Sequence, residues 1–219
     1  MDSPIRQYWE KRLENLRKCL ERNNFEVFVA DSADEARSVV MADILPTIGG
    51  KRVSWGGSQT FAMSMLYDAL KKDGELKIYD TYERDLLPEE LLERQRESLL
   101  TDVFITSANA VTESGVLVNL DMTGNRVAAV AFGPRHVVVL AGRNKIVSDI
   151  DEAMFRIRNY AAPVNAARYG SSAPCVRTSY CDDEACTGDD RLCNVWSITE
   201  KSFPRGRIKV VLINEDIGF

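Results

Sequence analysis

The sequence predicts an α/β fold built on an open, mostly parallel sheet with helices on both faces. Short apolar runs rich in valine and isoleucine alternate with segments whose apolar residues recur at helical spacing. Several of these runs are apolar almost throughout, which is typical of parallel strands buried on both faces. The chain has 219 residues, a length that supports a single domain spanning 1–219 with one sizeable core.

Predicted helices and strands alternate in the first half of the chain. A helix is expected to begin after Ser3-Pro4, because proline fits the first helical turn. The apolar residues that follow form one stripe at helical spacing: Ile5, Trp9, Leu13, Leu16 and Leu20. A capping box of Ser32 and Glu35 predicts a second helix towards Leu45. The other elements expected in this half are the strands 25–30, 51–55 and 75–80 and the helices 61–72 and 88–100.

The second half of the chain continues the alternation. Its apolar, β-branched runs predict strands over 101–107, 115–119 and 136–141, then a helix over 148–162 and a last strand over 206–219. These elements complete an open, Rossmann-like sheet. A polar, cysteine-containing loop over 170–195 separates the last helix from the last strand. Because the sheet does not need this loop, it is predicted to be an addition to a complete fold.

Composition and charge exclude several classes of protein. The net charge of −5 and the isoelectric point near 5.1 argue against broad nucleic-acid binding, since an acidic protein cannot neutralise many phosphates. No apolar run approaches the roughly 20 residues of a membrane span, and the charged N-terminus lacks a secretory signal. We therefore expect a cytoplasmic protein without a membrane span. Cysteines in a reducing compartment favour metal binding or redox chemistry over structural disulfides.

The segment after the strand 51–55 is the first candidate site, because ligands in such sheets bind beyond the carboxyl ends of strands. Gly56 and Gly57 allow backbone N–H groups to approach an anion, and Ser58 and Thr60 add hydroxyl groups at a helix N-terminus. A tight turn in which Ser58 only caps the helix explains the same residues equally well. The segment is neither a Walker loop nor a dinucleotide fingerprint.

A second candidate site follows the strand that ends near Ile105. Thr106, Ser107 and Asn109 place short polar groups at a strand end. Glu113 stands between two apolar runs, and a carboxylate enclosed there would have a raised pKa and act as a base, a nucleophile or a ligand anchor. The alternative is an exposed loop glutamate that caps a neighbouring backbone group.

A third candidate segment precedes the strand 136–141. Arg126 and Arg135 are suited to clamp a carboxylate or a phosphate. His136 is the only histidine of the chain, so a two-histidine metal site is excluded. A lone histidine at the start of a strand is more often structural than catalytic.

The loop over 170–195 contains four of the five cysteines, Cys175, Cys181, Cys186 and Cys193, in the spacing C-x5-C-x4-C-x6-C. Four thiolates suffice for a zinc ion or a [4Fe–4S] cluster, although this spacing is neither that of a zinc ribbon nor that of a ferredoxin. Four separate reduced thiols, or a disulfide formed on oxidation, are the alternatives. Cys19, beside the apolar stripe of the first helix, is expected to be a packing residue.

The chain resembles the LUD-domain family, whose members include lactate-utilization proteins. The resemblance rests on three stretches and covers most of the chain from about residue 10: "SWGGSQTF", "ITSANAVTESGVLVNLDMTGNRVAAVAFGPRHVVVLAG" and "GRIKVVLINEDIGF". It implies a fold similar to the NagB/RpiA/CoA-transferase group, whose members bind sugar phosphates, CoA esters or other anionic small molecules. It also implies a ligand loop at Gly56, Gly57 and Ser58, and it places Glu113 in a setting like that of the CoA-transferase carboxylate.

Three functions are compatible with this resemblance. The first is an accessory or electron-transfer subunit of an L-lactate oxidising system, working with iron–sulfur partner proteins. The second is a stand-alone CoA-transferase-like or isomerase-like enzyme that acts on an anionic metabolite through Glu113 and the glycine loop. The third is a non-catalytic ligand-binding or sensor module in which a metal holds the cysteine loop. The sequence leaves the ligand and the formation of a homo-oligomer open.

Overall fold

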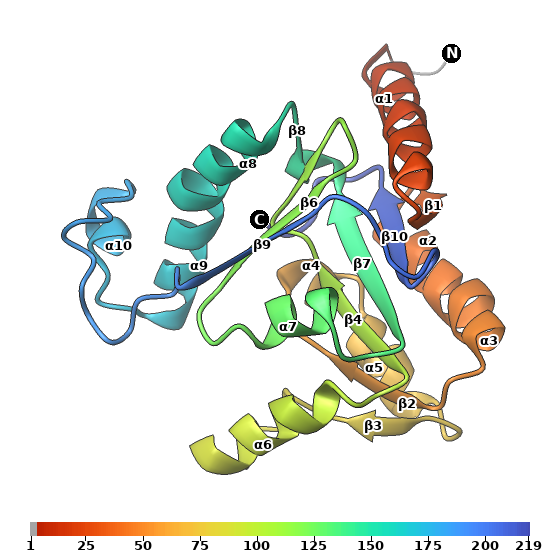
Figure 1. Ribbon diagram of the computed structural model, residues 1–219, viewed down its shortest axis with the longest axis horizontal. Helices are drawn as coiled ribbons and strands as arrows, with labels where there is room; N and C mark the ends of the chain where they lie inside the picture. The colour runs from red at the N-terminus through yellow and green to blue at the C-terminus, as the bar shows by residue number, and fades with distance from the viewer. Residues whose placement is uncertain (1–3) are drawn as a thin grey trace.

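The centre of the molecule is a sheet of six strands in the order β1-β10-β7-β4-β2-β3, and every neighbouring pair is parallel (Figure 1). A computed structural model describes residues 4–219 of the chain. The strands of this sheet are β1 (Glu26–Ala30), β2 (Arg52–Trp55), β3 (Lys77–Tyr79), β4 (Val103–Ser107), β7 (His136–Gly142) and β10 (Ile208–Ile213). The predicted open parallel sheet is confirmed.

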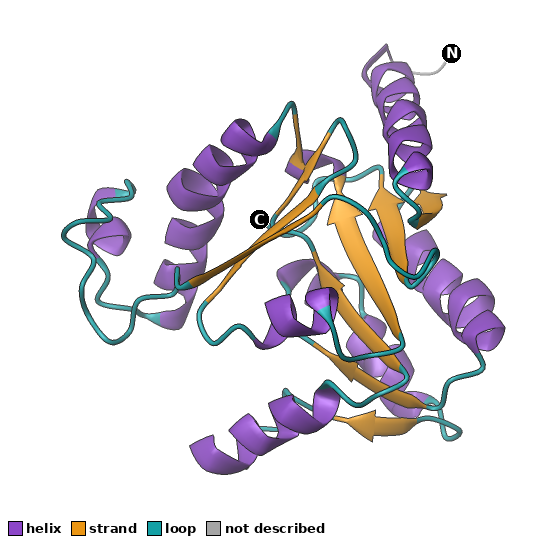
Figure 2. Ribbon diagram, in the orientation of Figure 1, coloured by secondary structure: helices purple, strands orange, loops and turns teal. Residues whose placement is uncertain are grey.

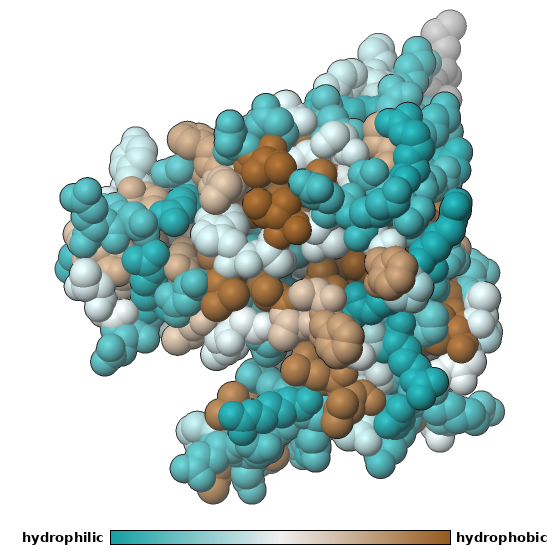
Figure 3. All heavy atoms as spheres, viewed as in Figure 1, coloured by the Kyte–Doolittle hydropathy of each residue, from teal (hydrophilic) through white to brown (hydrophobic). Residues whose placement is uncertain are grey.

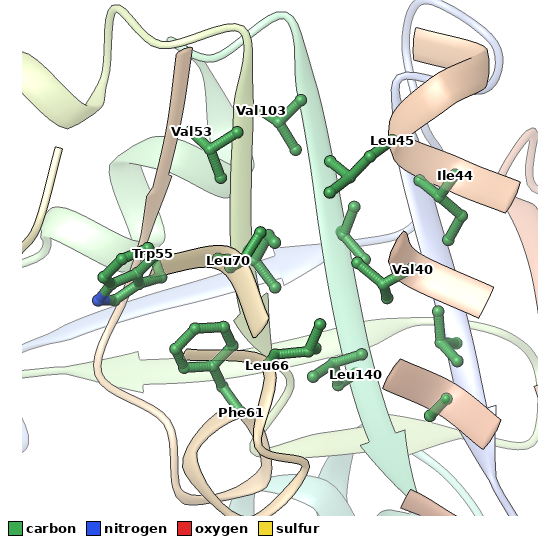
Figure 4. Packing of buried hydrophobic residues seen from close by; sticks show 14 of the residues in the cluster. Val40, Ile44, Leu45, Val53, Trp55, Phe61, Leu66, Leu70, Val103 and Leu140 are labelled. Atoms are coloured by element: carbon green, nitrogen blue, oxygen red, sulfur yellow. The ribbon is translucent and has the colours of Figure 1, made fainter. Parts of the chain in front are cut away.

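Helices cover one face of the central sheet. One continuous helical segment follows β1, and two short helices follow β2: α2 (Ala33–Ser38), η1 (Val39–Ile44), α3 (Leu45–Ile48), α4 (Gln59–Met63) and α5 (Leu66–Lys72). Their apolar side chains pack against Val53, Val103 and Leu140 of the strands, and Trp55 and Phe61 stack beside them (Figure 4). The expected single helix over 61–72 is broken at Met65, whose φ of 57° is left-handed.

The other face of the central sheet carries the first helix and a second sheet. The apolar stripe of α1 (Pro4–Arg22) packs on alternate residues of the central strands. Val137 and Val139 of β7 point to this side, whereas Val138 and Leu140 point to the helices of the opposite face. Burial on both faces therefore explains the continuous apolar run of β7.

The second sheet has four strands in the order β8-β5-β6-β9, and the sequence did not predict it. Its strands are β5 (Ala110–Thr112), β6 (Leu117–Asp121), β8 (Ile146–Val147) and β9 (Val195–Thr199). The run 115–119, expected in the parallel sheet, instead forms β6 and pairs antiparallel with both neighbours. Leu117 packs towards the central sheet, and Val116 and Val118 pack towards the outer helices. A strand buried on both faces has the same apolar pattern in either sheet.

An outer group of helices covers the second sheet, whose strands run between these helices and the central sheet (Figure 2). This group is one continuous segment: α8 (Ile150–Arg156), η3 (Ile157–Ala161) and α9 (Ala162–Tyr169). The remaining helices are α6 (Pro88–Ser98), α7 (Asn125–Ala131), η2 (Arg143–Lys145) and α10 (Pro174–Thr178). Within residues 4–219, none of the helices combines the length and apolar character that crossing a bilayer requires.

Leu140→Ala tests the importance of the helix-covered core, because Leu140 is fully buried in the middle of β7. We expect the free energy of unfolding to fall by about 2–5 kcal/mol, since the change removes buried methyl groups and leaves a cavity. Urea denaturation measures this loss. The control is Val29→Ala, because Val29 is partly exposed in the edge strand β1, and its effect should be much smaller. Equal losses in the two variants would contradict the packing described here.

Candidate functional site

A pocket of about 370 Å³ opens where the carboxyl ends of β2 and β4 meet the second sheet. Gly57 and Ser58 follow β2, Ser107 ends β4, and Asn109 begins the crossing from β4 to β5. Residues of α6, α7, η3 and α9 complete the wall. The surface is hollowed between α6, at the lower left, and the cysteine-containing part of the chain (Figure 3). The position and size are those of a small-molecule site in an open α/β sheet.

An ion pair between Arg126 and Asp121 forms one side of the pocket. Arg126 Nε donates to Asp121 Oδ1 over 2.8 Å, and Arg126 Nη2 donates to Asn109 Oδ1 over 2.8 Å. The other carboxylate oxygen of Asp121 accepts the backbone N–H of Val127 over 2.9 Å. Both side chains of the pair are 9% exposed. Because Asn109, β6 and α7 all meet in these bonds, the ion pair fixes the second sheet against the end of β4.

Lys145 lines the floor of the pocket and is 1% exposed. Its Nζ donates to Thr60 Oγ1 over 2.7 Å and to the carbonyl oxygen of Ala108 over 3.1 Å. Thr60 donates its own proton to the carbonyl oxygen of Ile217 over 3.2 Å. Within residues 4–219, no carboxylate forms an ion pair with this amine. Lys145 is therefore a buried base held by neutral acceptors.

The environment of Lys145 favours its unprotonated form. Burial, and to a smaller extent the positive charges of Arg156 and Arg126, together lower the pKa of Lys145 to about 7. Arg156 donates to the carbonyl oxygens of Asn109 over 2.8 Å and Asn144 over 3.2 Å. Burial also lowers the pKa of Arg156, although a guanidinium stays charged. At neutral pH, a substantial fraction of Lys145 carries a free lone pair.

The charges that line the pocket favour an anionic ligand. Among the described lining residues, Arg126, Lys145 and Arg168 have basic side chains and Asp121 has the one acidic side chain, and Phe219, the last residue of the sequence, also lines the pocket. The rest of the lining is divided between short polar side chains and apolar ones from α6, η3 and α9. Such a pocket suits a small molecule with a negatively charged group and a less polar remainder.

The glycine segment is both a tight turn and part of the pocket. Ser58 Oγ accepts the N–H of Phe61 over 3.1 Å, which caps α4, and donates to Ser107 Oγ over 2.8 Å. Gly56 does not line the pocket. It packs against the ring of Phe104 so closely that a Cβ at this position would lie 3.0 Å from the ring. A Cβ at Gly57 would meet only the hydroxyl oxygen of Tyr169, at 4.0 Å. The structure thus brings two of the three predicted loop residues to the pocket.

Of the polar residues predicted after β4, Ser107 and Asn109 line the pocket. Thr60 and Thr106 are fully buried and lie behind its surface. Thr60 holds the amine of Lys145, whereas the hydroxyl of Thr106 has no hydrogen-bond partner among the described residues.

Glu113, Arg135 and His136 lie away from the pocket. The expectation that Glu113 is enclosed is wrong: its side chain is 52% exposed and pairs with Arg12 over 2.8 Å. It follows β5 in the second sheet, in a turn that does not reach the pocket. Arg135 and His136 stand at the start of β7, whereas the pocket is at the carboxyl ends of the parallel strands. Burial lowers the pKa of His136, which favours its neutral form.

The segment that contains the four clustered cysteines includes α10, which packs against α9 and lies at the far left of Figure 1. All four cysteines are free thiols of intermediate exposure. Burial, with smaller contributions from the other three thiols, raises the pKa of Cys193 to about 11. Within residues 4–219, no three His, Cys, Asp or Glu side chains are arranged as metal ligands, so the thiols as placed do not form a metal centre. The metal site stays a prediction.

Sequence reasoning missed Lys145, Asp121 and Arg168. Lys145 lies three residues after Gly142, the last residue of β7. The rule that ligands bind beyond the carboxyl ends of strands would therefore have identified it, had the rule been applied to this strand. Asp121 ends β6, whose position in a second sheet was not predicted. Arg168 reaches the pocket from α9, and a solvent-facing helix residue carries no sequence signal of this role.

A family profile and a solved structure of similar fold match most of the chain. The sequence profile of the LUD domain matches residues 13–213. No curated protein matches the chain significantly. A crystal structure of a DUF162 family protein from Deinococcus radiodurans is similar over 94% of this chain and 98% of that chain, with 12% identity and a TM-score of 0.51. Ribose 5-phosphate isomerase A from Neisseria gonorrhoeae is similar over 55% of this chain and 57% of that chain, with 16% identity and a TM-score of 0.34.

Lys145→Met tests the protonation state of the buried amine through stability. The folded chain releases the proton near pH 7, whereas the unfolded chain keeps it to about pH 10.4, so the unfolded state binds more protons between these values. We therefore expect the free energy of unfolding of the natural chain to rise with pH across this window, relative to the variant. Urea denaturation at a series of pH values measures the difference. A difference that is constant with pH would contradict the burial of an unpaired amine.

Proposed function

The chain belongs to the LUD-domain family, and from this premise we propose that it serves 2-hydroxy-acid utilization by binding a small carboxylate of the lactate or pyruvate type in the pocket beside Lys145. Family membership supports the connection with lactate utilization. The pocket supplies the binding site, and its charge supplies the preference for an anion.

One observation carries this proposal: among the described residues, three basic side chains and a single acidic side chain line the pocket. The carboxylate of Asp121 is already paired with Arg126. Lys145 and the neighbouring Arg156 have only neutral acceptors among the described residues. A ligand carboxylate placed beside Arg126 and Arg168, which line the pocket, would gain charge-assisted hydrogen bonds from guanidinium groups that stay charged.

The narrower proposal is an accessory or electron-transfer subunit of an L-lactate oxidising system. Leu192 and Cys193 line the pocket, so the cysteine loop forms part of its wall. This continuity supports a functional connection between the loop and the ligand. The CoA-transferase-like alternative receives less support, because the Glu113 carboxylate is exposed and paired with Arg12. A non-catalytic sensor would use the same pocket without turnover.

Calorimetry with L-lactate and pyruvate tests the proposed ligand class. We expect both anions to bind and lactamide, which has the shape of lactate without its charge, to bind at least roughly tenfold more weakly, because it loses a charge-assisted hydrogen bond. Arg168→Gln should weaken the binding of both anions, since this guanidinium lines the pocket.

The matched control is Arg177→Gln, because Arg177 is exposed on α10 and does not line the pocket. This change alters the net charge by the same amount and should leave the affinity unchanged. Equal affinity for lactamide and L-lactate, or equal losses in the two arginine variants, would contradict an anion site in this pocket.

Metal analysis of anaerobically prepared protein tests the electron-transfer form of the proposal. If the loop holds an iron–sulfur cluster, iron should be stoichiometric and should be lost in Cys181→Ser, because the thiolates that bind a cluster act together. Cys19→Ser is the control, since Cys19 lies in α1. Protein that is iron-free when purified under these conditions would contradict an electron-transfer role for the loop, and stoichiometric zinc would favour the non-catalytic sensor instead.

A further inference from the structure

We infer that Lys145 is a nucleophile that forms an imine with the carbonyl carbon of a 2-oxo acid bound in the pocket. The inference rests on the proposed function, because it requires the pocket to hold a small carboxylate. It goes further by assigning a covalent role to one amine and by selecting 2-oxo acids over 2-hydroxy acids as the reacting ligands.

The hydrogen bonds around Lys145 match an unprotonated amine. A neutral amine has two hydrogens and one lone pair, and Nζ has two acceptors, Thr60 Oγ1 at 2.7 Å and the carbonyl oxygen of Ala108 at 3.1 Å. Thr60 uses its own proton on Ile217, so its oxygen accepts from the amine. Both hydrogens are then satisfied, and the fourth tetrahedral position holds the lone pair. Since Lys145 lines the pocket, a bound ligand can reach this position.

The surroundings of the amine favour nucleophilic attack. A lysine becomes a nucleophile when it is desolvated or lies near another cation, and Lys145 meets both conditions. Arg156 and Arg126 are the nearby cations. Arg126 and Arg168 line the pocket and attract the carboxylate of a 2-oxo acid, which would place the adjacent carbonyl group beside the amine.

The step balances without a redox partner. The lone pair of Nζ forms a bond to the carbonyl carbon, and the carbonyl π electrons move to oxygen. One amine proton and one proton from solvent reach that oxygen, which leaves as water. The product is a protonated imine that joins Nζ to the former carbonyl carbon. A 2-hydroxy acid such as L-lactate lacks the carbonyl group, so it can occupy the pocket without forming this bond.

Reductive trapping tests the inference on the full chain. Pyruvate or 2-oxopentanoate is added with sodium cyanoborohydride, which reduces an imine to a stable secondary amine, and the labelled lysines are identified by peptide mass spectrometry. We expect label on Lys145 in preference to the exposed Lys72 and Lys201. At pH 7, the unprotonated fraction of an amine with a pKa of about 7 is on the order of a thousandfold larger than that of an ordinary lysine.

Matched variants and a competitor sharpen the test. Lys145→Met should abolish the specific label, and Lys72→Met should leave it unchanged. Excess L-lactate should slow labelling, because it occupies the pocket without reacting. Thr60→Val should slow labelling while L-lactate still binds, since the variant removes the acceptor that orients the amine, and Thr60→Ser should restore the rate.

The outcomes separate this inference from the proposed function. Binding of pyruvate by calorimetry with no label on Lys145 would overturn the inference and leave the proposed function standing. Label spread over exposed lysines and unaffected by Lys145→Met would likewise overturn it. Failure of both pyruvate and L-lactate to bind would overturn the proposed function and the inference together.

Discussion

The burial of an amine without a carboxylate partner is the constraint on which the site depends. A protonated lysine in this position would lose its hydration without gaining a counter-charge, so the neutral form is favoured. The chain holds this amine with Thr60 at the start of α4 and Ala108 after β4. The C-terminal segment packs directly against Thr60, because Gly218 has a left-handed φ of 67° and a Cβ at this position would lie 2.4 Å from Thr60 Oγ1. Only glycine allows this close approach.

The second sheet converts the edge of a common α/β sheet into an enclosed pocket. The crossing from β4 to β5 carries Asn109, which accepts from Arg126 and from the backbone of Leu120. The ion pair of Arg126 with Asp121 then fixes the end of β6 over the same edge. The outer helices pack on the far face of β6 and contribute the remaining wall. The walls of the pocket and its basic side chains thus arise from one packing arrangement.

The sequence was sufficient for the central sheet and for part of the site. The strands and turns of the central sheet could be predicted because apolar runs and glycine turns are local patterns of the sequence. The rule that ligands bind beyond strand ends pointed to Ser58, Ser107 and Asn109, and all three line the pocket. The second sheet was not predictable, because a strand buried on both faces has the same pattern whichever sheet it joins. The exposure of the Glu113 side chain was not predictable for a related reason, because it depends on the turn between β5 and β6. The low pKa of Lys145 arises from three-dimensional packing, which no local pattern encodes.

The most direct test of this account is a titration of the Lys145 amine followed by NMR in lysine-labelled protein, with Lys145→Arg used to assign the signal. The account predicts a midpoint at a pKa of about 7, set by burial and by the neighbouring arginines. A midpoint near the ordinary lysine value of about 10.4 would show that the amine is hydrated or paired with a carboxylate. That result would contradict both the buried base and the chemistry assigned to it.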